Sequence, residues 1–419
     1  MLDIHRLRED PVGIEQRLKT RDSSIELEGI LTLDQQRLSL IHSVEQLKAE
    51  RNRGAQEVGR CRKAGEDASE LIASLAEVSD RIAEIDSELK RILSSIDQFM
   101  SLLPNVPHPT VPIGVKENKV TLHSFGKQSQ FDFKVKDHLT IGEEKEILDF
   151  RRAAMIAGTR FPMYTGLGAR LEMALVQFMF AHHAENGYTP VIPPFLANSE
   201  SLYVSSQLPK FADDIYHCEK DNLYLNPSAE SLLANLHRGE IFDEDELPRK
   251  YVAYTACFRR EAGTYGRDER GLIRIHQFNK IEMFKFATPE QSYAELDQLV
   301  VDAEEILREL GIHYRVTLLA TQDLAQQSSK TIDIEVYLPA QKRYYEVSSC
   351  SNCEDFQARR GNTRYRPGAG KKPRYVHTLN GSGVATPRLM AAILENNQMP
   401  DGRIHIPEVL QEMVGEEVI

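Results

Sequence analysis

Features that would place the chain outside the cell or in a membrane are scarce in its sequence. There are only 5 cysteines among 419 residues, an odd and sparse set that indicates a reducing compartment rather than a disulfide framework. No run of about 18 apolar residues occurs, so no membrane-spanning helix is predicted. The opening residues, MLDIHRLREDPVG, lack the apolar stretch of a secretory signal. We therefore expect a cytoplasmic protein with no membrane partner.

An excess of positive charge is absent too. Lysine and arginine number 51 against 63 aspartates and glutamates, which gives a net charge of −12. This balance argues against general coating of nucleic acid, so a polyanionic partner would have to meet local basic patches. The sequence also lacks a G-x-x-x-x-G-K-[ST] segment and a convincing G-x-G-x-x-G segment, so neither of these phosphate-binding loops is predicted.

A regular seam of apolar residues is the clearest pattern that is present. Between residues 71 and 103 steps of four and three alternate, as in a helix that packs on a partner helix. A second seam, from 33 to 61, supplies the partner, and KAGED at 63–67 interrupts the pattern. We predict an antiparallel helical hairpin with arms of about 30 residues. The seams consist of Leu71, Leu75, Val78, Ile82, Ile85, Leu89, Ile92, Ile96, Phe99 and Leu103, and of Leu33, Leu40, Val44, Leu47, Val58 and Cys61.

The tip of this hairpin is basic. Six basic residues and two acidic ones lie within residues 48–63, a local net charge of +4. The apolar seam fails in the same stretch, because Arg51 and Gly54 occupy two of its inward positions. Two interpretations stay open, a solvated helix end and a surface for a phosphate backbone. The basic residues are Lys48, Arg51, Arg53, Arg60, Arg62 and Lys63.

A proline-rich segment, PNVPHPTVPIG at 104–114, ends the hairpin and predicts a linker. Beyond it the pattern is mixed, with a helix predicted at 168–187 and a short strand at 188–195. Alternation at 250–263 and 271–286 predicts two antiparallel strands joined by GTYGRDER. This arrangement favours an α+β fold with an antiparallel β-sheet over a doubly wound α/β fold.

Arginine is concentrated in one segment, FRREAGTYGRDERGLIRIHQFNKIEMF at 258–284. Because alternate residues of a strand share a face, guanidinium groups, carboxylates and an aromatic ring would converge across the two strands. Such a set suits a nucleotide, with arginine on phosphate and Phe278 as a stacking surface. The alternative is a surface hairpin whose charges pair across its strands. The face predicted on the returning strand carries Arg274, His276, Phe278, Lys280 and Glu282.

The F-R-x-E core of this segment resembles motif 2 of the class II aminoacyl-tRNA synthetases. The segment as a whole resembles the seryl-tRNA synthetases of the bacterial type. YYEVSSCSNCEDFQARR at 344–360, HTLNGSGVATPRLMAAILENNQ at 377–398 and DGRIHIPEVL at 401–410 agree with that family. The second of these contains the motif 3 pattern, in which Arg388 opens a helix. The likeness covers nearly the whole chain.

The resemblance implies the organisation of the molecule. Residues 1–112 would form a tRNA-binding helical hairpin, a coiled-coil arm. Residues 113–419 would form a class II catalytic domain on an antiparallel sheet. The chain would pair as a homodimer through the region around residues 168–195.

The resemblance also implies an activity. The chain would activate L-serine with ATP to form seryl-adenylate, and then transfer the seryl group to tRNA(Ser), and to tRNA(Sec) where that tRNA is present. Mg²⁺ would accompany ATP. Two alternatives stay open. One is a synthetase-like paralogue that adenylates an amino acid for another acceptor, and the other is an inactive coiled-coil interaction protein.

Roles for individual residues follow from the same resemblance. Arg259 and Arg388 would be catalytic, Glu261 would read the adenine amino group, and Glu346 with Ser349 would bind Mg²⁺. The ATP-binding set is Arg259, Arg260, Glu261, Arg274, Phe278, Glu346, Val347, Ser348, Ser349 and Arg388. The serine-binding set is Ser228, Ala229, Glu230, Arg259, Glu282, Asn380 and Ser382. The tRNA-binding set is Arg51, Arg53, Arg60, Arg62, Arg267 and Arg270.

The chain departs from the family pattern near the predicted serine and tRNA sides. The departures leave the level of activity open, but they do not touch the predicted ATP residues. They are Ser228 in place of threonine, Val204, Ser206, Gln322 and Ala325 in place of glycines, and ATPR at 385–388 in place of the commoner A-V-G-R.

Overall fold

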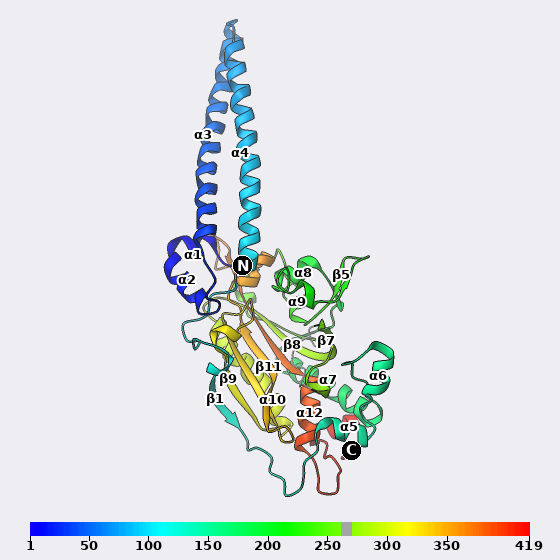
Figure 1. The fold of residues 1–419 in the computed structure, drawn as a ribbon. Coiled ribbons are helices and arrows are strands. Elements are labelled where there is room, and N and C mark those ends of the chain that lie inside the picture. Colours follow the sequence, from blue (N-terminus) through cyan, green and yellow to red (C-terminus); the bar gives the residue numbers. More distant parts are fainter. Residues whose placement is uncertain (261–269) are drawn as a thin grey trace. The chain divides into compact units, whose positions relative to one another are not determined.

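A computed structural model describes residues 1–260 and 270–419. The chain divides into two compact units (Figure 1). The helical unit consists of Leu2–Lys19 and Ser23–Leu103, and the sheet unit consists of Met1, Thr20–Asp22 and Pro104–Ile419. Among the residues that the structure describes, no helix is both long and apolar enough to cross a bilayer.

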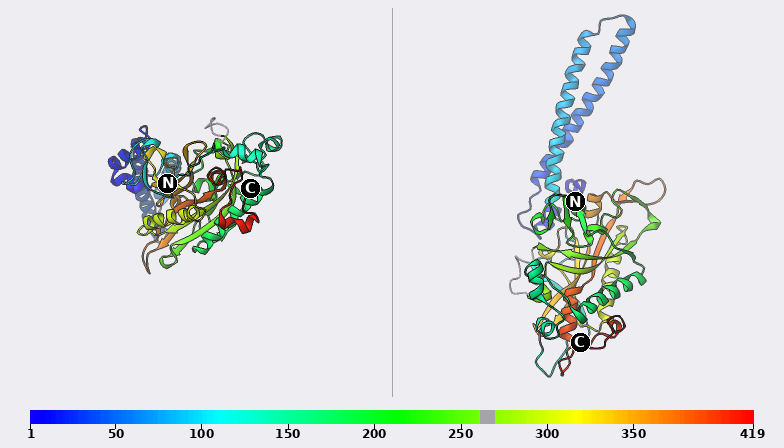
Figure 2. Two further views of the ribbon diagram at one scale, coloured as in Figure 1. Left: turned by 90° about the horizontal axis from the view of Figure 1, so that it is seen from below. Right: turned by 90° about the vertical axis from the view of Figure 1, so that its right-hand side faces the viewer.

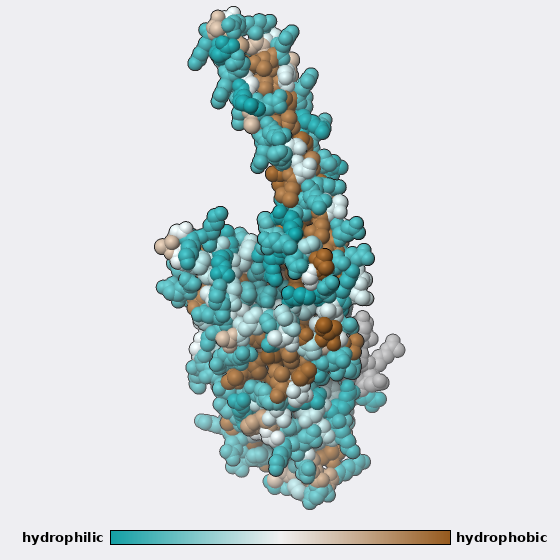
Figure 3. All heavy atoms as spheres, turned by 90° about the vertical axis from the view of Figure 1, so that its left-hand side faces the viewer, coloured by the Kyte–Doolittle hydropathy of each residue, from teal (hydrophilic) through white to brown (hydrophobic). Residues whose placement is uncertain are grey.

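Two long helices dominate the helical unit and confirm the predicted hairpin. Helix α3 (Glu28–Ala64) has 37 residues and helix α4 (Ser69–Leu102) has 34, so both exceed the predicted length. Gly65 ends α3 in the left-handed region, at φ 76°, where glycine carries no steric cost. A stripe of apolar atoms follows the hairpin (Figure 3). The short helices α1 (Ile4–Glu9) and α2 (Pro11–Lys19) precede it.

The sheet unit is built on an eight-stranded sheet, with the strand order β1-β9-β10-β11-β14-β8-β7-β2. All neighbouring strands are antiparallel except β2 and β7. The predicted α+β class with an antiparallel sheet is therefore confirmed. The strands are β1 (Val120–Phe125), β2 (Thr189–Val191), β7 (Arg249–Phe258), β8 (Gln277–Ala287), β9 (Tyr314–Leu318), β10 (Lys330–Leu338), β11 (Arg343–Asn352) and β14 (His377–Ala385).

Three helices pack on this sheet and bury its apolar side chains. Helix α7 (Gly166–Glu185) lies against β7 and β8, and helix α10 (Ser292–Glu309) lies against β11 and β14. Helix α12 (Thr386–Asn396) follows β14 directly and contacts β8, β10 and β11. The shared core includes fully buried residues from every layer, such as Leu175, Met283, Ile306 and Leu394. This core holds the strands that carry the predicted site in fixed register.

Smaller elements complete the sheet unit (Figure 2). Two three-stranded sheets are formed by β13 (Arg374–Tyr375), β12 (Arg364–Arg366) and β6 (Ile241–Asp243), and by β3 (Leu196–Asn198), β5 (Leu223–Leu225) and β4 (His217–Cys218). The remaining α-helices are α5 (His138–Glu144), α6 (Phe150–Ala157), α8 (Ser199–Val204), α9 (Glu230–Leu233), α11 (Phe356–Gly361) and α13 (Glu408–Val414). Short 3₁₀ turns occur at η1 (Lys116–Asn118), η2 (Ala212–Asp214), η3 (Glu244–Glu246), η5 (Gly271–Ile273) and η6 (Thr321–Asp323).

The strand predicted at 271–286 is wrong in its first part. The strand β8 begins only at Gln277, and the turn η5 takes the place of its start. The reason is that side chains from distant segments satisfy the backbone of η5. The Leu272 N–H donates to His138, and the Ile273 carbonyl accepts from Arg388. Arg274, which caps η5, therefore does not share a strand face with Phe278 as predicted.

Candidate active site

Buried polar side chains gather on β8 and the loop before α9. The Lys280 ammonium lies 2.5 Å from Glu282 Oε2, and the Ser228 hydroxyl donates to the same oxygen over 3.2 Å. Glu282 is 2% exposed and Lys280 is 8% exposed. A buried carboxylate needs such a partner, because desolvation of an isolated charge is costly. The predicted strand face carried Lys280 beside Glu282, but the predicted serine-binding set included Ser228 and Glu282 and omitted Lys280.

A second buried carboxylate, Glu230, stands at the start of α9. Its Oε1 accepts from Gln327 Nε2 at 2.8 Å and from Gln357 Nε2 at 2.7 Å. Burial, together with the negative charge of Glu282, raises the pKa of Glu230 to about 7. The predictions missed both glutamines, because they come from segments about 100 residues further along the chain. The site therefore holds two carboxylates. Glu282 has the ammonium of Lys280 as a partner, whereas Glu230 has two neutral amides as hydrogen-bond partners.

The strand β14 contributes the neighbouring wall. Ser382 lies directly opposite Glu282 in the strand register, and Asn380 lies opposite Phe284. Asn380 and Ser382 are two residues apart on one strand, so they share a face. Both are nearly buried, and so is Ala229 beside Ser228. The structure thus brings Ser382, a residue of the predicted serine set, next to the Lys280–Glu282 pair.

Arg259 connects this cluster to the aromatic ring predicted for adenine. It follows the end of β7, and its Nε donates to the carbonyl of Pro227, the residue before Ser228. Its guanidinium carbon lies 5.2 Å from the centre of the Phe278 ring. Arg260 lies over a different ring, that of Tyr216, at 5.0 Å. Glu261 and Arg267 lie outside the described residues.

Arg388 links three of the predicted segments. It stands in the first turn of α12, where its Nη1 donates to the Glu346 carbonyl over 2.6 Å and lies 3.9 Å from Glu346 Oε1. Its Nε donates to the carbonyl of Ile273, one residue before Arg274. One guanidinium therefore joins α12, β11 and the turn η5.

Carboxylate and hydroxyl side chains gather on β10 and β11. Ser349 pairs with Asp333 across the two strands, and Glu346 pairs with Glu335. Burial and the negative charge of Glu346 raise the pKa of Asp333 well above its usual range, and its Oδ1 accepts no hydrogen bond. Carboxylate and hydroxyl oxygens suit Mg²⁺, a hard cation that commonly takes one or two carboxylates and completes its shell with phosphate and water. Within residues 1–260 and 270–419, no cluster of three or more Asp, Glu, His or Cys side chains is arranged to hold a metal alone.

Val347 and Ser348 occupy buried positions on β11 between Glu346 and Ser349. The Ser348 hydroxyl donates to the Ser382 carbonyl over 2.5 Å. This bond ties the strand predicted to hold ATP to the strand predicted to hold serine. Val347 is apolar and the Ser348 hydroxyl is already paired, so we expect any polar contact of these two residues with ATP to come from the backbone.

Two departures from the family pattern have local structural explanations. Ser206 adopts φ 70°, the left-handed region that favours glycine. Thr386, in the ATPR segment, donates its hydroxyl to the buried carboxylate of Glu172 over 2.5 Å. Pro387 stands in the first turn of α12, where the missing N–H costs no helical hydrogen bond. The ATPR segment is therefore compatible with the helix that carries Arg388.

The arginines predicted to bind tRNA lie at two places. Arg51, Arg53, Arg60 and Arg62 belong to the last turns of α3 in the helical unit, and Arg270 follows the undescribed segment in the sheet unit. The Arg60 guanidinium lies 2.6 Å from Glu57 and 3.8 Å from Glu66, so part of its charge is balanced.

Two family models match the sequence. The model described as "Seryl-tRNA synthetase N-terminal domain" matches residues 1–107, and "tRNA synthetase class II core domain (G, H, P, S and T)" matches residues 216–397. The proteins named "Serine--tRNA ligase" from Thermodesulfovibrio yellowstonii and Desulfitobacterium hafniense are 48% and 46% identical to the chain, with 100% of both chains covered in each case.

Solved structures agree with the sequence matches. The crystal structure of seryl-tRNA synthetase from Pyrococcus horikoshii complexed with ATP has a TM-score of 0.95 and 39% identity, covering 100% of this chain and 99% of that one. The cytoplasmic serine-tRNA ligase of Naegleria fowleri in complex with AMP has a TM-score of 0.89 and 28% identity, covering 100% and 98%. These likenesses do not favour the paralogue or the interaction protein. The chain belongs to the seryl-tRNA synthetases, the serine–tRNA ligases of class II.

Proposed function

We propose that the buried polar residues of β8, β14 and the loop before α9 form a pocket that binds L-serine and presents it to ATP for formation of seryl-adenylate. The observation that carries this proposal is the pair of buried carboxylates with different charge balance. Glu282 already has the ammonium of Lys280, whereas Glu230 has two neutral amides and a raised pKa. A ligand with one ammonium group and one hydroxyl complements this arrangement.

Serine fits the pocket through three kinds of contact. Its ammonium group pairs with Glu230, which then remains ionised because the opposite charge offsets the cost of burial. Its hydroxyl reaches Glu282 and Ser382, with Asn380 on the same wall. Its carboxylate pairs with Arg259, whose position is fixed by the Pro227 carbonyl. Each polar group of the amino acid thus has a partner of complementary charge.

The chemistry then needs orientation more than proton transfer. A serine carboxylate oxygen attacks the α-phosphorus of ATP, a new P–O bond forms, and the bond to the β-phosphate oxygen breaks, releasing pyrophosphate. The nucleophile is already ionised, so no general base is required. Arg259 and Arg388 hold the phosphates and stabilise the charge that builds on them. When bound, Mg²⁺ supplies further neutralisation of phosphate charge, and Glu346 with Ser349 would hold it. In the second step a hydroxyl at the tRNA 3′ end attacks the acyl carbonyl and AMP leaves.

We assign the remaining partners as follows. tRNA(Ser), and tRNA(Sec) where present, binds the basic tip of the helical unit. The chain acts as a homodimer in the cytoplasm. Pairing is supported by two exposed apolar side chains in the predicted region, Met173 at 58% and Ile192 at 73%. A sedimentation measurement that gave the mass of a single chain at micromolar concentration would overturn the dimer.

Pyrophosphate exchange into ATP tests the central proposal. Exchange should depend on serine, and serine should exceed alanine by about 10⁴-fold or more, because a site built around a hydroxyl leaves its polar groups unpaired with the analogue that lacks it. Comparable exchange with the two amino acids would refute the assignment of Glu282 and Ser382. Exchange with serine but no charging of tRNA would favour the paralogue.

A further inference from the structure

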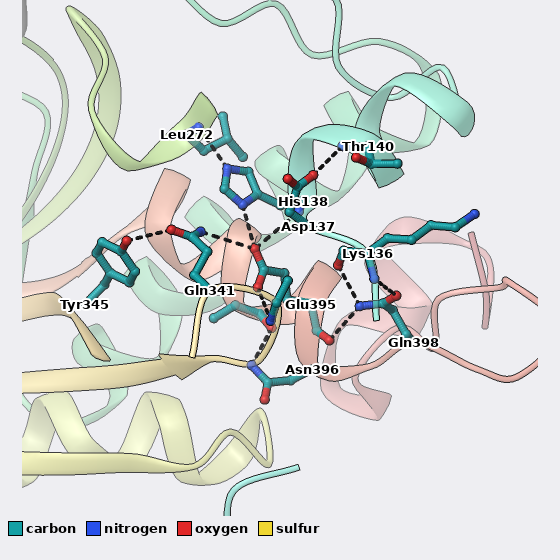
Figure 4. A network of polar contacts seen from close by, with 12 residues as sticks. Lys136, Asp137, His138, Thr140, Leu272, Gln341, Tyr345, Glu395, Asn396 and Gln398 are labelled. Atoms are coloured by element: carbon teal, nitrogen blue, oxygen red, sulfur yellow. Dashed lines mark hydrogen bonds and ion pairs between the residues drawn. The ribbon is translucent and has the colours of Figure 1, made fainter. Parts of the chain in front are cut away.

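A buried histidine–glutamate pair lies next to the predicted ATP site and has no role in the steps above. His138 begins α5 and is 2% exposed, and Glu395 stands near the end of α12 and is 0% exposed. His138 Nδ1 lies 2.8 Å from Glu395 Oε1, and the backbone N–H of His138 donates to the same oxygen over 3.2 Å. Figure 4 shows the two side chains pointing toward each other from separate helices.

The other ring nitrogen of His138 contacts the backbone of η5. Its Nε2 accepts the N–H of Leu272 over 3.2 Å. An acceptor at Nε2 carries no proton, so in a neutral ring the proton is on Nδ1 and is donated to Glu395. Glu395 therefore favours the tautomer of His138 whose Nε2 can accept the N–H of Leu272. Gly271, at φ 65°, brings the chain so close that an added Cβ would lie 2.5 Å from His138 Nε2.

The turn η5 lies between two predicted ligand-binding arginines. Arg270 precedes it and Arg274 caps its end. Helix α12 holds the turn at two points: Arg388 donates to the Ile273 carbonyl, and Glu395 acts on Leu272 through His138. Arg388 and Glu395 are seven residues apart, two helical turns, so both lie on one side of α12. In the backbone before Arg274, the Leu272 N–H and the Ile273 carbonyl therefore both have side-chain partners.

Glu395 is itself firmly held. Its Oε2 accepts the N–H of Ala340 over 3.1 Å, and its Oε1 accepts from the Gln341 amide over 3.5 Å. Tyr345, the residue before Glu346, donates its hydroxyl to Gln341 Oε1 over 2.6 Å. Figure 4 shows this chain of contacts running from Leu272 to Tyr345. A carboxylate with this many hydrogen-bond donors is held in one position, so it can hold the ring of His138 in one orientation.

We infer that His138, oriented by Glu395, is a positioning residue for ATP binding. It fixes the peptide of Leu272 and through it the start of the arginine-bearing segment that ends at Arg274. It touches neither ATP nor serine. The inference rests on the proposed function in one respect, the assignment of Arg274 to ATP.

Two substitutions at one position separate the two ring contacts. Asparagine places its amide near Nδ1, so His138→Asn keeps the contact with Glu395 and removes the acceptor for Leu272. Glutamine reaches the position of Nε2, so His138→Gln keeps the acceptor for Leu272 and removes the contact made through Nδ1. We expect His138→Asn to weaken equilibrium binding of ATP by about tenfold, since a buried N–H is left unpaired. His138→Gln should stay within about threefold of the parent, and the KM for serine should change little in either.

Asp137→Ala is the matched control for helix stability. Asp137 caps the start of α5 by accepting the Thr140 N–H, and it does not contact Leu272. Its loss should lower the unfolding temperature without changing ATP affinity. Equal loss of ATP affinity in His138→Asn and His138→Gln, no loss in His138→Asn, or a similar loss in Asp137→Ala would each overturn the positioning role. If the parent binds ATP but shows no serine-dependent exchange, the proposed function fails while these comparisons still decide the inference.

Discussion

At the scale of single residues, the Lys280 ammonium gives the buried Glu282 carboxylate a partner of opposite charge. A buried ion pair contributes little net stability, but removing one partner leaves an uncompensated charge. In the proposed function the pair serves to keep a charged acceptor for the serine hydroxyl more than it serves as a stabilising contact. The free energy of unfolding should fall more on removal of one partner than on removal of both, which gives a direct test.

We predict that Lys280→Met destabilises the folded chain by about 3–5 kcal/mol, because the Glu282 carboxylate is left buried and unpaired. The double variant Lys280→Met with Glu282→Gln removes both charges and should recover most of that loss. Serine-dependent exchange should be poor in both variants. Chemical denaturation measures the change in stability, and equal destabilisation in single and double variants would show that the two groups do not interact.

Glu230 makes the pocket sensitive to pH. Its folded pKa of about 7 lies above the usual value for glutamate, so folding favours its protonated form. The resulting stabilisation is complete below the unfolded pKa of about 4.3 and is lost as the pH rises through about 7. In the proposed function the serine ammonium pairs with the ionised form. We therefore expect protonation of Glu230 to oppose serine binding at lower pH.

We predict that kcat/KM for serine falls as the pH drops below about 7, approaching tenfold per unit. Glu230→Gln should bind serine weakly, with no such dependence. The variant should also gain stability relative to the parent as the pH rises through about 7, because it has no carboxylate to ionise. A pH profile and paired unfolding curves test both statements. An identical kcat/KM profile in parent and variant would contradict them.

At the scale of elements, the sequence was informative where periodicity is local. The heptad seam predicted the hairpin because every contact it implies comes from the helices themselves. The turn η5 was misread as strand because its partners, His138 and Arg388, are more than 100 residues away along the chain. Alternation alone does not report such partners. Gln327 and Gln357 were missed around Glu230 for the same reason, whereas Lys280 was within reach of the strand-face argument.

The failure of the seam at Gly54 has a packing explanation. A Cβ added there would lie 2.5 Å from Leu75 Cδ2, so the glycine allows α3 and α4 to approach closely. The other glycine in the interior of α3, Gly59, has nothing within 4 Å of such an atom. Both glycines belong to α3, but only Gly54 has a close neighbour at the position of an added Cβ. The gap in the seam is therefore a site of close contact and not simply a poorly packed end.

We predict different effects for alanine at these two glycines. Gly59→Ala should stabilise the helical unit by about 0.5–1 kcal/mol, the usual difference in helix propensity. Gly54→Ala gains the same propensity, but it has to displace Leu75, at a typical overpacking cost of about 1–3 kcal/mol. Its net effect should be neutral to destabilising. Thermal unfolding followed by circular dichroism compares them, and equal stabilisation in both variants would contradict the close approach.

At the scale of the whole molecule, the residues predicted for ATP and serine and four of the arginines predicted for tRNA belong to different units. All described residues predicted for ATP and serine lie in the sheet unit, and the predicted arginines on α3 lie in the helical unit. The chain as a whole is acidic, with a net charge of −12. Binding of tRNA must therefore depend on local basic surfaces, and their loss should affect charging without affecting amino acid activation.

We predict that replacing Arg51, Arg53, Arg60 and Arg62 with glutamine leaves serine-dependent exchange intact and weakens tRNA charging. The dependence of log affinity on log salt should flatten by up to about 0.7–0.9 for each phosphate that the variant no longer neutralises. Arg60 should contribute least, because Glu57 and Glu66 already balance its charge. A control variant with glutamine at Arg81, Lys90 and Arg91 of α4 removes exposed positive charge from the same unit. The control should keep the parent slope. An unchanged slope and unchanged charging in the α3 variant would show that the basic tip is a solvated helix end.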